Sequence, residues 1–323
     1  RKMDATLNIA IAAEFELSEK IVDFLEQSAV NISKVSAIEI FPFEEEQYLR
    51  FKKSSVSQIA LENVDWSSFH YVFFAGNIEQ ASHIAAAADA GCVVIDLFAI
   101  CGILPDVPVV VPGINDTNLI ELRQRNIVSL ANPQVSQISL ALTPILQQTE
   151  LSQIFVTSLL PASYLHAENV TKLANQTARL LNGIPLEKTE RRLAFDVFPK
   201  ETSHLTLQLQ KIYPQLNDIV FHQIQVPVFY GMAQKVTVFA KGLIESVMEN
   251  SSLIQWHETM ITPVLNSENE SGDDAVKLHI TQPKILESEN GQVLEFWSVA
   301  DEQRFHIAQL GTKLFESLYF QGY

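Results

Sequence analysis

Short apolar runs alternate with amphipathic helical stretches over the first 132 residues of the chain. The stretch 17–28 places its apolar residues on one helical stripe, and Ser18 is its expected N-cap. A second helix is predicted over 78–91. This strand–helix rhythm is typical of a parallel sheet with helices on both faces. The strands predicted here cover residues 7–13, 35–41, 70–76, 92–96, 107–113 and 127–131.

The pattern changes after residue 135. A helix predicted over 136–148 is followed by one over 167–183, which has Leu173 and Leu181 on its apolar stripe and ends at Asn182-Gly183, a natural C-cap. Long alternating strands then predict a mixed or antiparallel sheet, interrupted by an acidic surface loop over 266–274 and closed by a helix over 304–318. These strands cover residues 191–198, 218–231, 234–242, 275–282 and 291–300.

Composition and charge narrow the class of protein. The 323 residues suffice for about two domains, and 38 acidic against 22 basic residues give a net charge of -16. That charge argues against binding to nucleic acid or to an anionic membrane, and no apolar run approaches the ~20 residues of a spanning helix. Two cysteines form no disulfide framework, so we expect a reducing, cytoplasmic location. No metal-ligand spacing occurs, so no metal is predicted.

The stretch 130–138 has the form of an active-site loop. A strand runs into Asn132-Pro133, and the turn presents residue 135 at a helix N-terminus, where backbone N–H groups favour an anion or a thiolate. The residue at this position is Val135, whose isopropyl side chain has no nucleophilic, acidic or basic group. Ser136 is expected to cap the helix, and its alternative role as a nucleophile lacks a base. Cys101, among apolar neighbours, is expected to be an inert thiol.

Seven segments of the chain carry a resemblance to a known family: "IVSLANPQVSQ", "VVIDLFAICGILPDVPVVVPGIN", "VTSLLPAS", "ANQTARLLNG", "RRLAFDVFP", "QVPVFYGMAQ" and "FWSVADEQRF". Together they resemble the aspartate-semialdehyde dehydrogenases, and most of all the Usg-type paralogues of that family. The resemblance implies an α/β fold with a Rossmann-like, dinucleotide-binding-type domain made of residues 1–132 and 305–323. A central α+β domain like that of glyceraldehyde-phosphate dehydrogenase, residues 133–304, would carry catalysis and the dimer interface.

The resemblance also implies where catalytic residues should stand, and each position is substituted. Val135 replaces the nucleophilic cysteine, and an isopropyl group cannot form a thioacyl intermediate. Met232 replaces the general-base histidine and has no proton to exchange near neutral pH. Leu160 replaces the glutamine that positions the nucleophile and the substrate. No catalytic residue is therefore predicted, and the site is expected to be apolar.

Substrate recognition is substituted as well. Gln225 stands in place of the arginine that would grip the substrate carboxylate, and Gly102 in place of a phosphate-binding arginine. The family's Glu-x-x-Lys helix pair aligns with Glu201 and His204, which are the weak candidates for a residual ligand site. Their alternative reading is a plain surface pair at helical spacing.

The implied NADP site has the wrong charge. Ala13, Glu16 and Glu19 replace the glycines of the family's phosphate-binding turn, and two carboxylates there would repel a diphosphate. Glu44–Glu46 align with the residues for the 2′-phosphate, and Glu302 with an asparagine near the nicotinamide. No cofactor is predicted.

The sequence therefore predicts a catalytically inactive member of the family that acts through protein association. Its expected state is a homodimer, or a heterodimer with an active relative. The alternative is an oxidoreductase or ligand-binding protein that reuses the pocket, apolar at Val135, Leu160 and Met232, with a degenerate NADP site.

Overall fold

The computed structural model describes residues 6–117, 119, 121–247, 250–264, 276–281 and 283–323. The chain divides into an N-terminal unit, residues 1–132 with 306–323, and a C-terminal unit, residues 133–305. On the C-terminal side this division lies one residue after the boundary placed between 304 and 305. The acidic loop predicted over 266–274 and both ends of the strand predicted over 275–282 lie outside the described residues.

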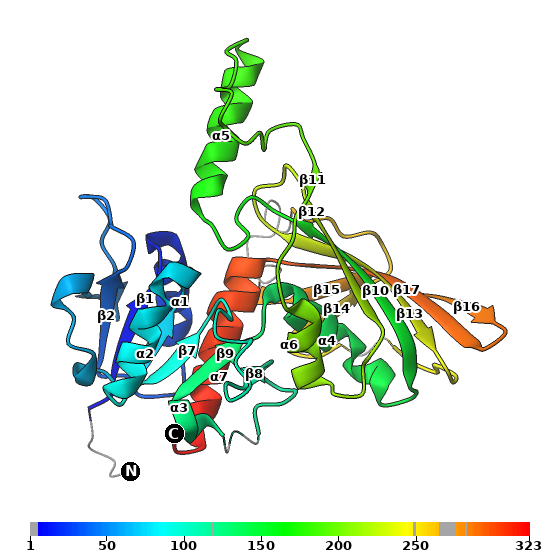
Figure 1. Cartoon of the computed structure of the whole chain (residues 1–323), viewed down its shortest axis with the longest axis horizontal. Coiled ribbons are helices and arrows are strands. Elements are labelled where there is room, and N and C mark those ends of the chain that lie inside the picture. The colour runs from blue at the N-terminus through cyan, green and yellow to red at the C-terminus, as the bar shows by residue number, and fades with distance from the viewer. Residues whose placement is uncertain (1–5, 118, 120, 248–249, 265–275, 282) are drawn as a thin grey trace. The chain divides into compact units, whose positions relative to one another are not determined.

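The N-terminal unit contains a seven-stranded sheet in the order β5-β2-β1-β6-β7-β9-β8, in which every neighbouring pair is parallel (Figure 1). Its strands are β1 (Asn8–Ala12), β2 (Lys34–Glu39), β5 (Ser57–Ala60), β6 (Tyr71–Phe74), β7 (Val93–Asp96), β8 (Val109–Val110) and β9 (Ile127–Leu130). The unit also has the helices α1 (Phe15–Glu26), α2 (Ala81–Asp89), α3 (Leu122–Arg125) and α7 (Leu310–Phe320), and a two-stranded sheet of β3 (Arg50–Phe51) and β4 (Ser54–Ser55).

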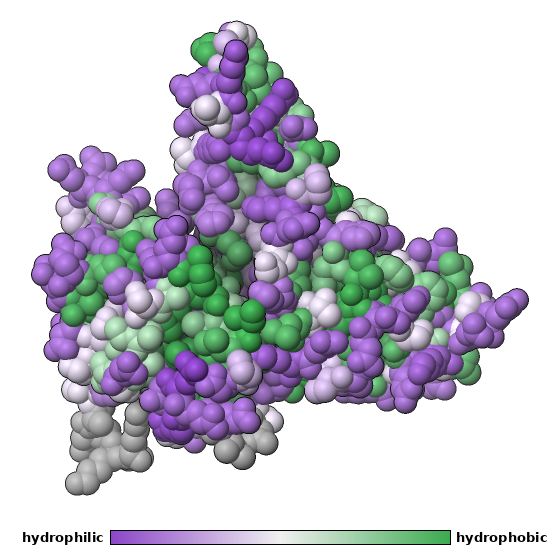
Figure 2. All heavy atoms as spheres, viewed as in Figure 1, coloured by the Kyte–Doolittle hydropathy of each residue, from purple (hydrophilic) through white to green (hydrophobic). Residues whose placement is uncertain are grey.

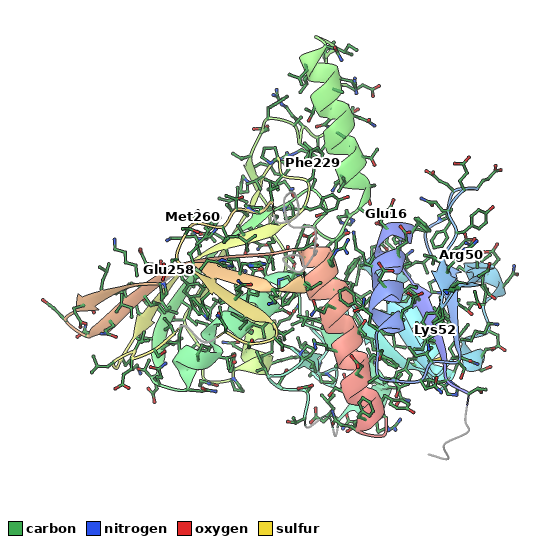
Figure 3. All side chains as sticks on the ribbon, turned by 180° about the vertical axis from the view of Figure 1, so that it is seen from behind. Glu16, Arg50, Lys52, Phe229, Glu258 and Met260 are labelled. Carbon is green, nitrogen blue, oxygen red and sulfur yellow. The ribbon has the colours of Figure 1, made fainter. Side chains whose placement is uncertain are left out.

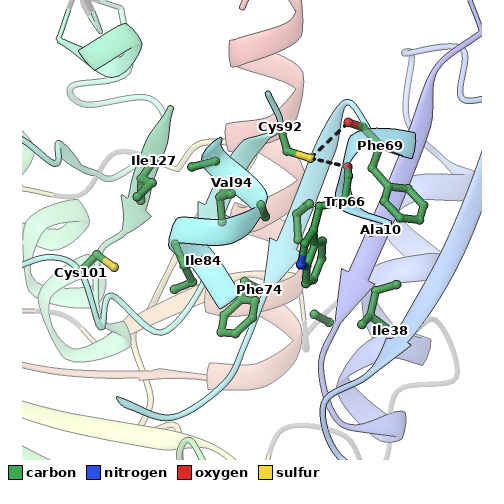
Figure 4. Packing of buried hydrophobic residues seen from close by; sticks show 14 of the residues in the cluster. Ala10, Ile38, Trp66, Phe69, Phe74, Ile84, Cys92, Val94, Cys101 and Ile127 are labelled. Atoms are coloured by element: carbon green, nitrogen blue, oxygen red, sulfur yellow. Dashed lines mark hydrogen bonds between the residues drawn. The ribbon is translucent and has the colours of Figure 1, made fainter. Parts of the chain in front are cut away.

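Helices cover both faces of this parallel sheet. Strand β6 contacts a helix on each face, because successive side chains of a strand point to opposite faces of the sheet. On one face, the rings of Tyr71 and Phe73 meet the ring of Phe315 on α7, with centroids 4.9 and 5.7 Å apart. On the other, Val72 and Phe74 belong to the cluster that packs against α2 (Figure 4). The predicted parallel sheet with helices on both faces is confirmed.

The start of α1 differs from its prediction. The helix begins at Phe15, and Glu14 occupies the N-cap position. Ser18 lies buried within the helix, where its hydroxyl donates to the backbone carbonyl of Ala13 at 3.3 Å. The prediction of Ser18 as N-cap was wrong because apolar periodicity locates a stripe and not the first turn.

The C-terminal unit contains a mixed eight-stranded sheet in the order β11-β12-β10-β13-β17-β15-β14, with β16 paired to β17. This confirms the predicted mixed sheet, although most of the stretch 191–198 is not a strand. The strands are β10 (Leu151–Leu160), β11 (Phe198–Pro199), β12 (Ile219–Gln225), β13 (Met232–Ala240), β14 (Ile254–His257), β15 (Leu278–Thr281), β16 (Lys284–Ser288) and β17 (Gly291–Ala300). The helices of the unit are α4 (Pro133–Leu146), α5 (Glu168–Leu181) and α6 (Leu205–Ile212).

Only one face of this sheet is covered by helices in the described part of the chain. Along β10, the side chains of Ile154 and Val156 are buried on the face that carries α4 and α6, while Phe155 between them is partly exposed. We call the second face the open sheet face. The strand register places on it Phe155, Val220, Lys235, Phe239, Glu295 and Trp297.

Helix α5 projects away from the sheet of its unit and, with the return segment 182–197, forms an arm (Figure 1). Its end is the predicted C-cap. Gly183, with φ +71°, donates to Leu180 at 3.1 Å, and Ile184 donates to Arg179 at 2.8 Å. Leu181 was expected on the buried stripe but is 73% exposed, because the thin arm buries little of the helix. The surface of the arm mixes hydrophilic and hydrophobic residues (Figure 2).

The last helical segment of the chain consists of a π-helix followed by an α-helix. The prediction was a helix over 304–318, and the structure has a π-helix over Glu302–Gln309 that leads into α7. Gly311 allows α7 to approach β7 closely, since a Cβ there would lie 2.7 Å from a methyl group of Leu97. The C-terminal helix thus completes the N-terminal unit, as expected for the Rossmann-like domain.

Candidate functional site

Helix α4 begins at Pro133, three residues before the predicted start. Proline suits the first helical position, because its φ is already helical and its missing N–H would have no partner there. Val135 and Ser136 therefore lie in the first turn, and both are fully buried. The prediction that Ser136 caps the helix was wrong, because Ser136 lies inside it.

Leu160 and Met232 lie in one buried cluster with Tyr164. Leu160 ends β10 and Met232 begins β13, and neither side chain is exposed. Gly231, just before Met232, has φ +93°, and a Cβ there would lie 2.2 Å from the carbonyl oxygen of Pro263. Only glycine fits this position. The cluster brings together, in an apolar environment, two of the three positions at which the resemblance expects catalytic residues.

A network of buried glutamine amides occupies the same end of the sheet. Gln234 donates from Nε2 to the backbone oxygen of Gln134 at 2.9 Å and to the hydroxyl of Ser158 at 3.1 Å. Gln134 in turn donates from Nε2 to the hydroxyl of Tyr164 at 2.9 Å and to Oε1 of Gln223 at 3.0 Å. Buried amides are stable only when hydrogen-bonded, so the network fixes this part of the fold.

Gln137 adds a further amide on α4. Its Nε2 donates to the hydroxyl of Ser298 at 2.9 Å, and both side chains are fully buried. The pattern of the sequence does not predict this network. The only signal for it was the number of glutamines at positions 134, 137, 223, 225 and 234.

Gln225, at the position of the family's substrate arginine, ends β12 and is almost fully buried. Its Nε2 donates to the backbone oxygen of Leu160 at 3.0 Å, and its Oε1 lies 3.4 Å from Nζ of Lys200. Burial lowers the pKa of Lys200. No motif in the sequence marks Lys200 as a residue of this site.

Glu201 and His204 do not form a helical pair. Both are exposed, and both precede α6, which begins at Leu205. His204 has φ +68° at the N-cap position, so it turns the chain into the helix. The helical placement predicted for these two residues is wrong.

Acidic residues occupy positions that the resemblance assigns to the binding of the cofactor phosphates. Glu16 is exposed in the first turn of α1 (Figure 3), and Glu19 follows one turn later. Partial burial and then repulsion from Asp23 and Glu16 raise the pKa of Glu19. The ring of Phe15 packs edge-on against that of Phe43, 5.4 Å away. Ala13 is fully buried, and Glu44–Glu46 are exposed.

The two thiols lie in the N-terminal unit. Burial raises the pKa of Cys92 to about 11 and that of Cys101, beside Gly102, to about 12. The sulfur of Cys92 donates to the backbone oxygens of Trp66 and Phe69 at 2.9 and 3.2 Å (Figure 4). Both thiols are therefore protonated at neutral pH.

Glu302 is a buried carboxylate at the start of the π-helix. The hydroxyl of Ser163 donates to its Oε1, and Gln303 donates to the backbone oxygen of Ser163 at 3.1 Å. Among the described residues, no group of three or more His, Cys, Asp and Glu side chains could hold a metal ion. No helix in the same residues is long and apolar enough to cross a membrane.

Comparison with known proteins shows the family. No family model matches the chain. The USG-1 protein homolog of Haemophilus influenzae is 63% identical over 321 residues, which cover 99% of this chain and 100% of that protein. An aspartate-semialdehyde dehydrogenase of Vibrio mimicus is 30% identical over 260 residues, covering 76% of this chain and 82% of the enzyme.

A solved structure agrees. The crystal structure of aspartate semialdehyde dehydrogenase II from Vibrio cholerae superposes with a TM-score of 0.87 at 26% identity, covering 99% of this chain and 100% of that chain. The sequence resemblance and the fold class expected from it are confirmed. The chain belongs to the aspartate-semialdehyde dehydrogenase family and, within it, is of the Usg type.

Proposed function

We propose that this chain lacks the dehydrogenase chemistry of its family and acts through protein association. The burial of Val135 at the position of the nucleophile is the observation that carries the first part. A valine cannot attack a carbonyl carbon, and Leu160 and Met232 supply neither an amide nor a proton acceptor. The neighbouring glutamine amides are hydrogen-bonded to one another and to the backbone.

The proposal includes the loss of NADP binding. A diphosphate at the N-terminus of α1 would meet Glu16 in the first turn, and the acids Glu44–Glu46 would disfavour a 2′-phosphate. At a separation of about 4 Å, each unfavourable pair of unit charges contributes about 1 kcal/mol in bulk water and about 4 kcal/mol at the effective dielectric near a protein surface. Ala13, Glu16 and Glu19 stand in place of the glycines and add side-chain bulk where a pyrophosphate would approach the backbone.

An activity assay tests this part. We expect no phosphate-dependent reduction of NADP with aspartate semialdehyde, measured beside an active family member as positive control. Turnover that Val135→Ala leaves unchanged would contradict the loss of catalysis. In a separate titration, NADPH binding with a Kd below about 100 μM, or about −5.5 kcal/mol, would contradict the loss of the cofactor site.

The open sheet face supports the second part of the proposal. Phe155 and Phe239 are in edge-on contact on it, with centroids 6.0 Å apart, and Phe155 is 38% exposed. Lys235 and Glu295 place opposite charges on the same face. A two-fold dimer pairs the same surface patch of both subunits, so the patch must be complementary to its own copy. A patch with an apolar centre and with one positive and one negative side chain can meet this requirement. The proposed partner is therefore a second copy of the chain, or an active relative with the same face.

Light scattering after size-exclusion chromatography tests the association. The wild-type chain is expected to elute as a dimer and Phe155→Glu as a folded monomer, while Tyr48→Glu, an exposed aromatic in the N-terminal unit, leaves the dimer intact. A wild-type monomer, or a dimer of Phe155→Glu, would contradict the use of this face.

Purification from native cells identifies the partner. Recovery of an active relative would support the heterodimer, and recovery of this chain alone the homodimer. We also propose a cytoplasmic location, since both cysteines are buried free thiols.

A further inference from the structure

A pocket of about 760 Å³ lies in the C-terminal unit where strand β10 begins, and we call it the β10 pocket. It is lined by residues 146, 149–152, 215, 217, 218 and 241. Pockets for small molecules usually enclose about 300–1,000 Å³. Leu151 and Leu160 are the two ends of β10, and a strand rises about 3.3 Å per residue, so the pocket lies about 30 Å along the strand from Leu160. It is therefore separate from the positions where the resemblance expects catalytic residues.

Hydrogen bonds hold the walls of the β10 pocket in place. On one side, Gly242 donates from its backbone N–H to Oγ1 of Thr149 at 2.7 Å, which ties the segment after β13 to the connection before β10. On the other side, Ile154 of β10 donates from its backbone N–H to the backbone oxygen of Asp218 at 2.8 Å. Both walls are thus fixed by the fold, so a ligand would not have to order them before it bound.

The lining of the β10 pocket combines an apolar surface with one uncompensated negative charge. Leu146 ends α4 and Leu151 begins β10, and both side chains are partly exposed. Glu150 and Lys241 form an ion pair at 3.3 Å, so their charges offset each other. The carboxylate of Asp218 forms no ion pair with another residue in the described part of the chain. The charge of the lining therefore favours a ligand with one positive charge.

The hydrogen-bonding groups beside Asp218 also favour a ligand that donates. Ser152 and Asp218 precede the paired residues Ile154 and Ile219 of β10 and β12, so they lie at the same end of two neighbouring strands. The hydroxyl of Ser152 donates to the backbone oxygen of Phe239 at 3.2 Å, which leaves its oxygen as an acceptor. An ionised carboxylate can only accept. Two neighbouring acceptors thus border the apolar surface of the pocket.

We propose that the β10 pocket binds a small aliphatic amine in its protonated form. The ammonium group donates charge-assisted hydrogen bonds to the carboxylate of Asp218 and to the hydroxyl oxygen of Ser152, and the alkyl chain covers Leu146 and Leu151. The net charge of the lining repels a carboxylate, and a neutral alcohol leaves the charge of Asp218 without a counter-ion. The inference depends neither on the proposed loss of dehydrogenase chemistry nor on the proposed association.

Calorimetric titration of the full chain with butylamine at neutral pH tests the pocket. We expect saturable binding, which Asp218→Asn weakens about tenfold or more because it removes the charge and keeps the shape. The matched control is Asp196→Asn, at an exposed position of the same unit, which should leave binding unchanged. Lys241→Met should strengthen binding about threefold, since it leaves Glu150 as a second uncompensated carboxylate. Thermal unfolding shows that each variant is folded.

Measurements on the wild-type chain avoid reliance on variants. Butyrate and butanol have the same alkyl chain and should bind at least about tenfold more weakly than butylamine. In ¹⁵N-labelled protein, butylamine should shift the backbone amide resonances of Ser152 and Asp218 and leave that of Met232, at the other end of β13 from Lys241, in place. The proposal is overturned if butylamine does not bind saturably, if butyrate binds as tightly, if Asp218→Asn or Lys241→Met gives the opposite change, or if the resonance of Met232 shifts in place of the other two.

Discussion

The side-chain amide of Gln234 donates a hydrogen bond to the backbone carbonyl oxygen of Gln134, 2.9 Å away. This bond joins strand β13 to the first turn of α4, and a second bond from the same nitrogen reaches Ser158 on β10. One amide thus links three elements that are far apart in the sequence. Val135 lies in the first turn of α4, Leu160 ends β10 and Met232 begins β13, so the amide holds together the region in which the resemblance places the catalytic residues.

Replacement of Gln234 by leucine should destabilise the fold. The change removes the donor to both Gln134 and Ser158 and leaves their buried oxygens with one partner fewer, so we expect the free energy of unfolding to fall by about 1–3 kcal/mol. Urea denaturation measures it. Gln215→Leu, at an exposed position, is the control, and an equal effect of both substitutions would contradict a role for the network.

A thiol introduced at position 135 should be as unreactive as the natural ones. Val135→Cys is expected to resist a disulfide-exchange reagent in the folded protein and to react in urea, because the site is fully buried. Cys92 and Cys101, whose pKa values burial raises to about 11 and about 12, should behave in the same way. The variant alone should gain no dehydrogenase activity.

Ser203→Cys provides the comparison for that experiment, because position 203 is exposed. Its thiol should react quickly in the folded protein. Labelling of Val135→Cys at a similar rate would show that position 135 opens to solvent.

His306 should make the protein less stable in acid. Burial lowers its pKa to about 3, from an ordinary value of 6.5. Between these values the unfolded chain binds a proton that the folded chain does not. The contribution of His306 to the free energy of unfolding is therefore complete above about pH 6.5. It falls by up to about 1.4 kcal/mol for each pH unit between about pH 6.5 and about pH 3.

The measurement compares wild type with His306→Gln by urea denaturation at several pH values. The comparison is necessary because Asp96 acts in the opposite direction: burial, opposed by hydrogen bonds from Ser129 and the backbone, raises its pKa to about 6. Its contribution to stability therefore rises as the pH falls. The advantage of wild type over His306→Gln should shrink in acid, and a constant difference would contradict the assignment.

Gln176 should hold the arm together. Its Oε1 accepts hydrogen bonds from the backbone N–H groups of Leu193 and Ala194 at 2.7 and 3.1 Å, and its Nε2 donates to the backbone oxygen of Arg191 at 2.8 Å. In Gln176→Ala we expect faster hydrogen exchange and proteolysis of the return segment 182–197, with little change in global unfolding. Asn175→Ala, exposed on the same helix, is the control, and equal protection in both variants would contradict this role.

The fold was predictable because its signals are local. Residues 93–96 and 127–130 form the short, uninterrupted apolar runs of strands buried on both faces, and Asn182-Gly183 carries the conformational signature of a helix end. The starts of α1 and α4 were misplaced because serine at an expected cap position can equally lie inside a helix. Ser18 and Ser136 both do.

The candidate site was predictable only at its substituted positions. Val135 and Met232 were found from neighbouring motif residues, whereas the partners of Gln234 come from α4 and β10, and no local pattern links them. At His204 the sequence predicted structure that is not there. Its spacing from Glu201 suggested a helix that the structure begins only at Leu205.

The burial of Val135 has a consequence for evolution. On the proposed function, Val135→Cys would gain no dehydrogenase activity until Leu160 and Met232 had also changed. Each polar residue placed at those two positions, which lie in one apolar cluster, would cost about 1–3 kcal/mol unless it found a hydrogen-bond partner. Every intermediate sequence would carry this loss of stability with no catalytic return. On the same proposal, selection for stability would disfavour the intermediates, so the apolar packing of Leu160 and Met232 would make the dehydrogenase chemistry of the family hard to regain.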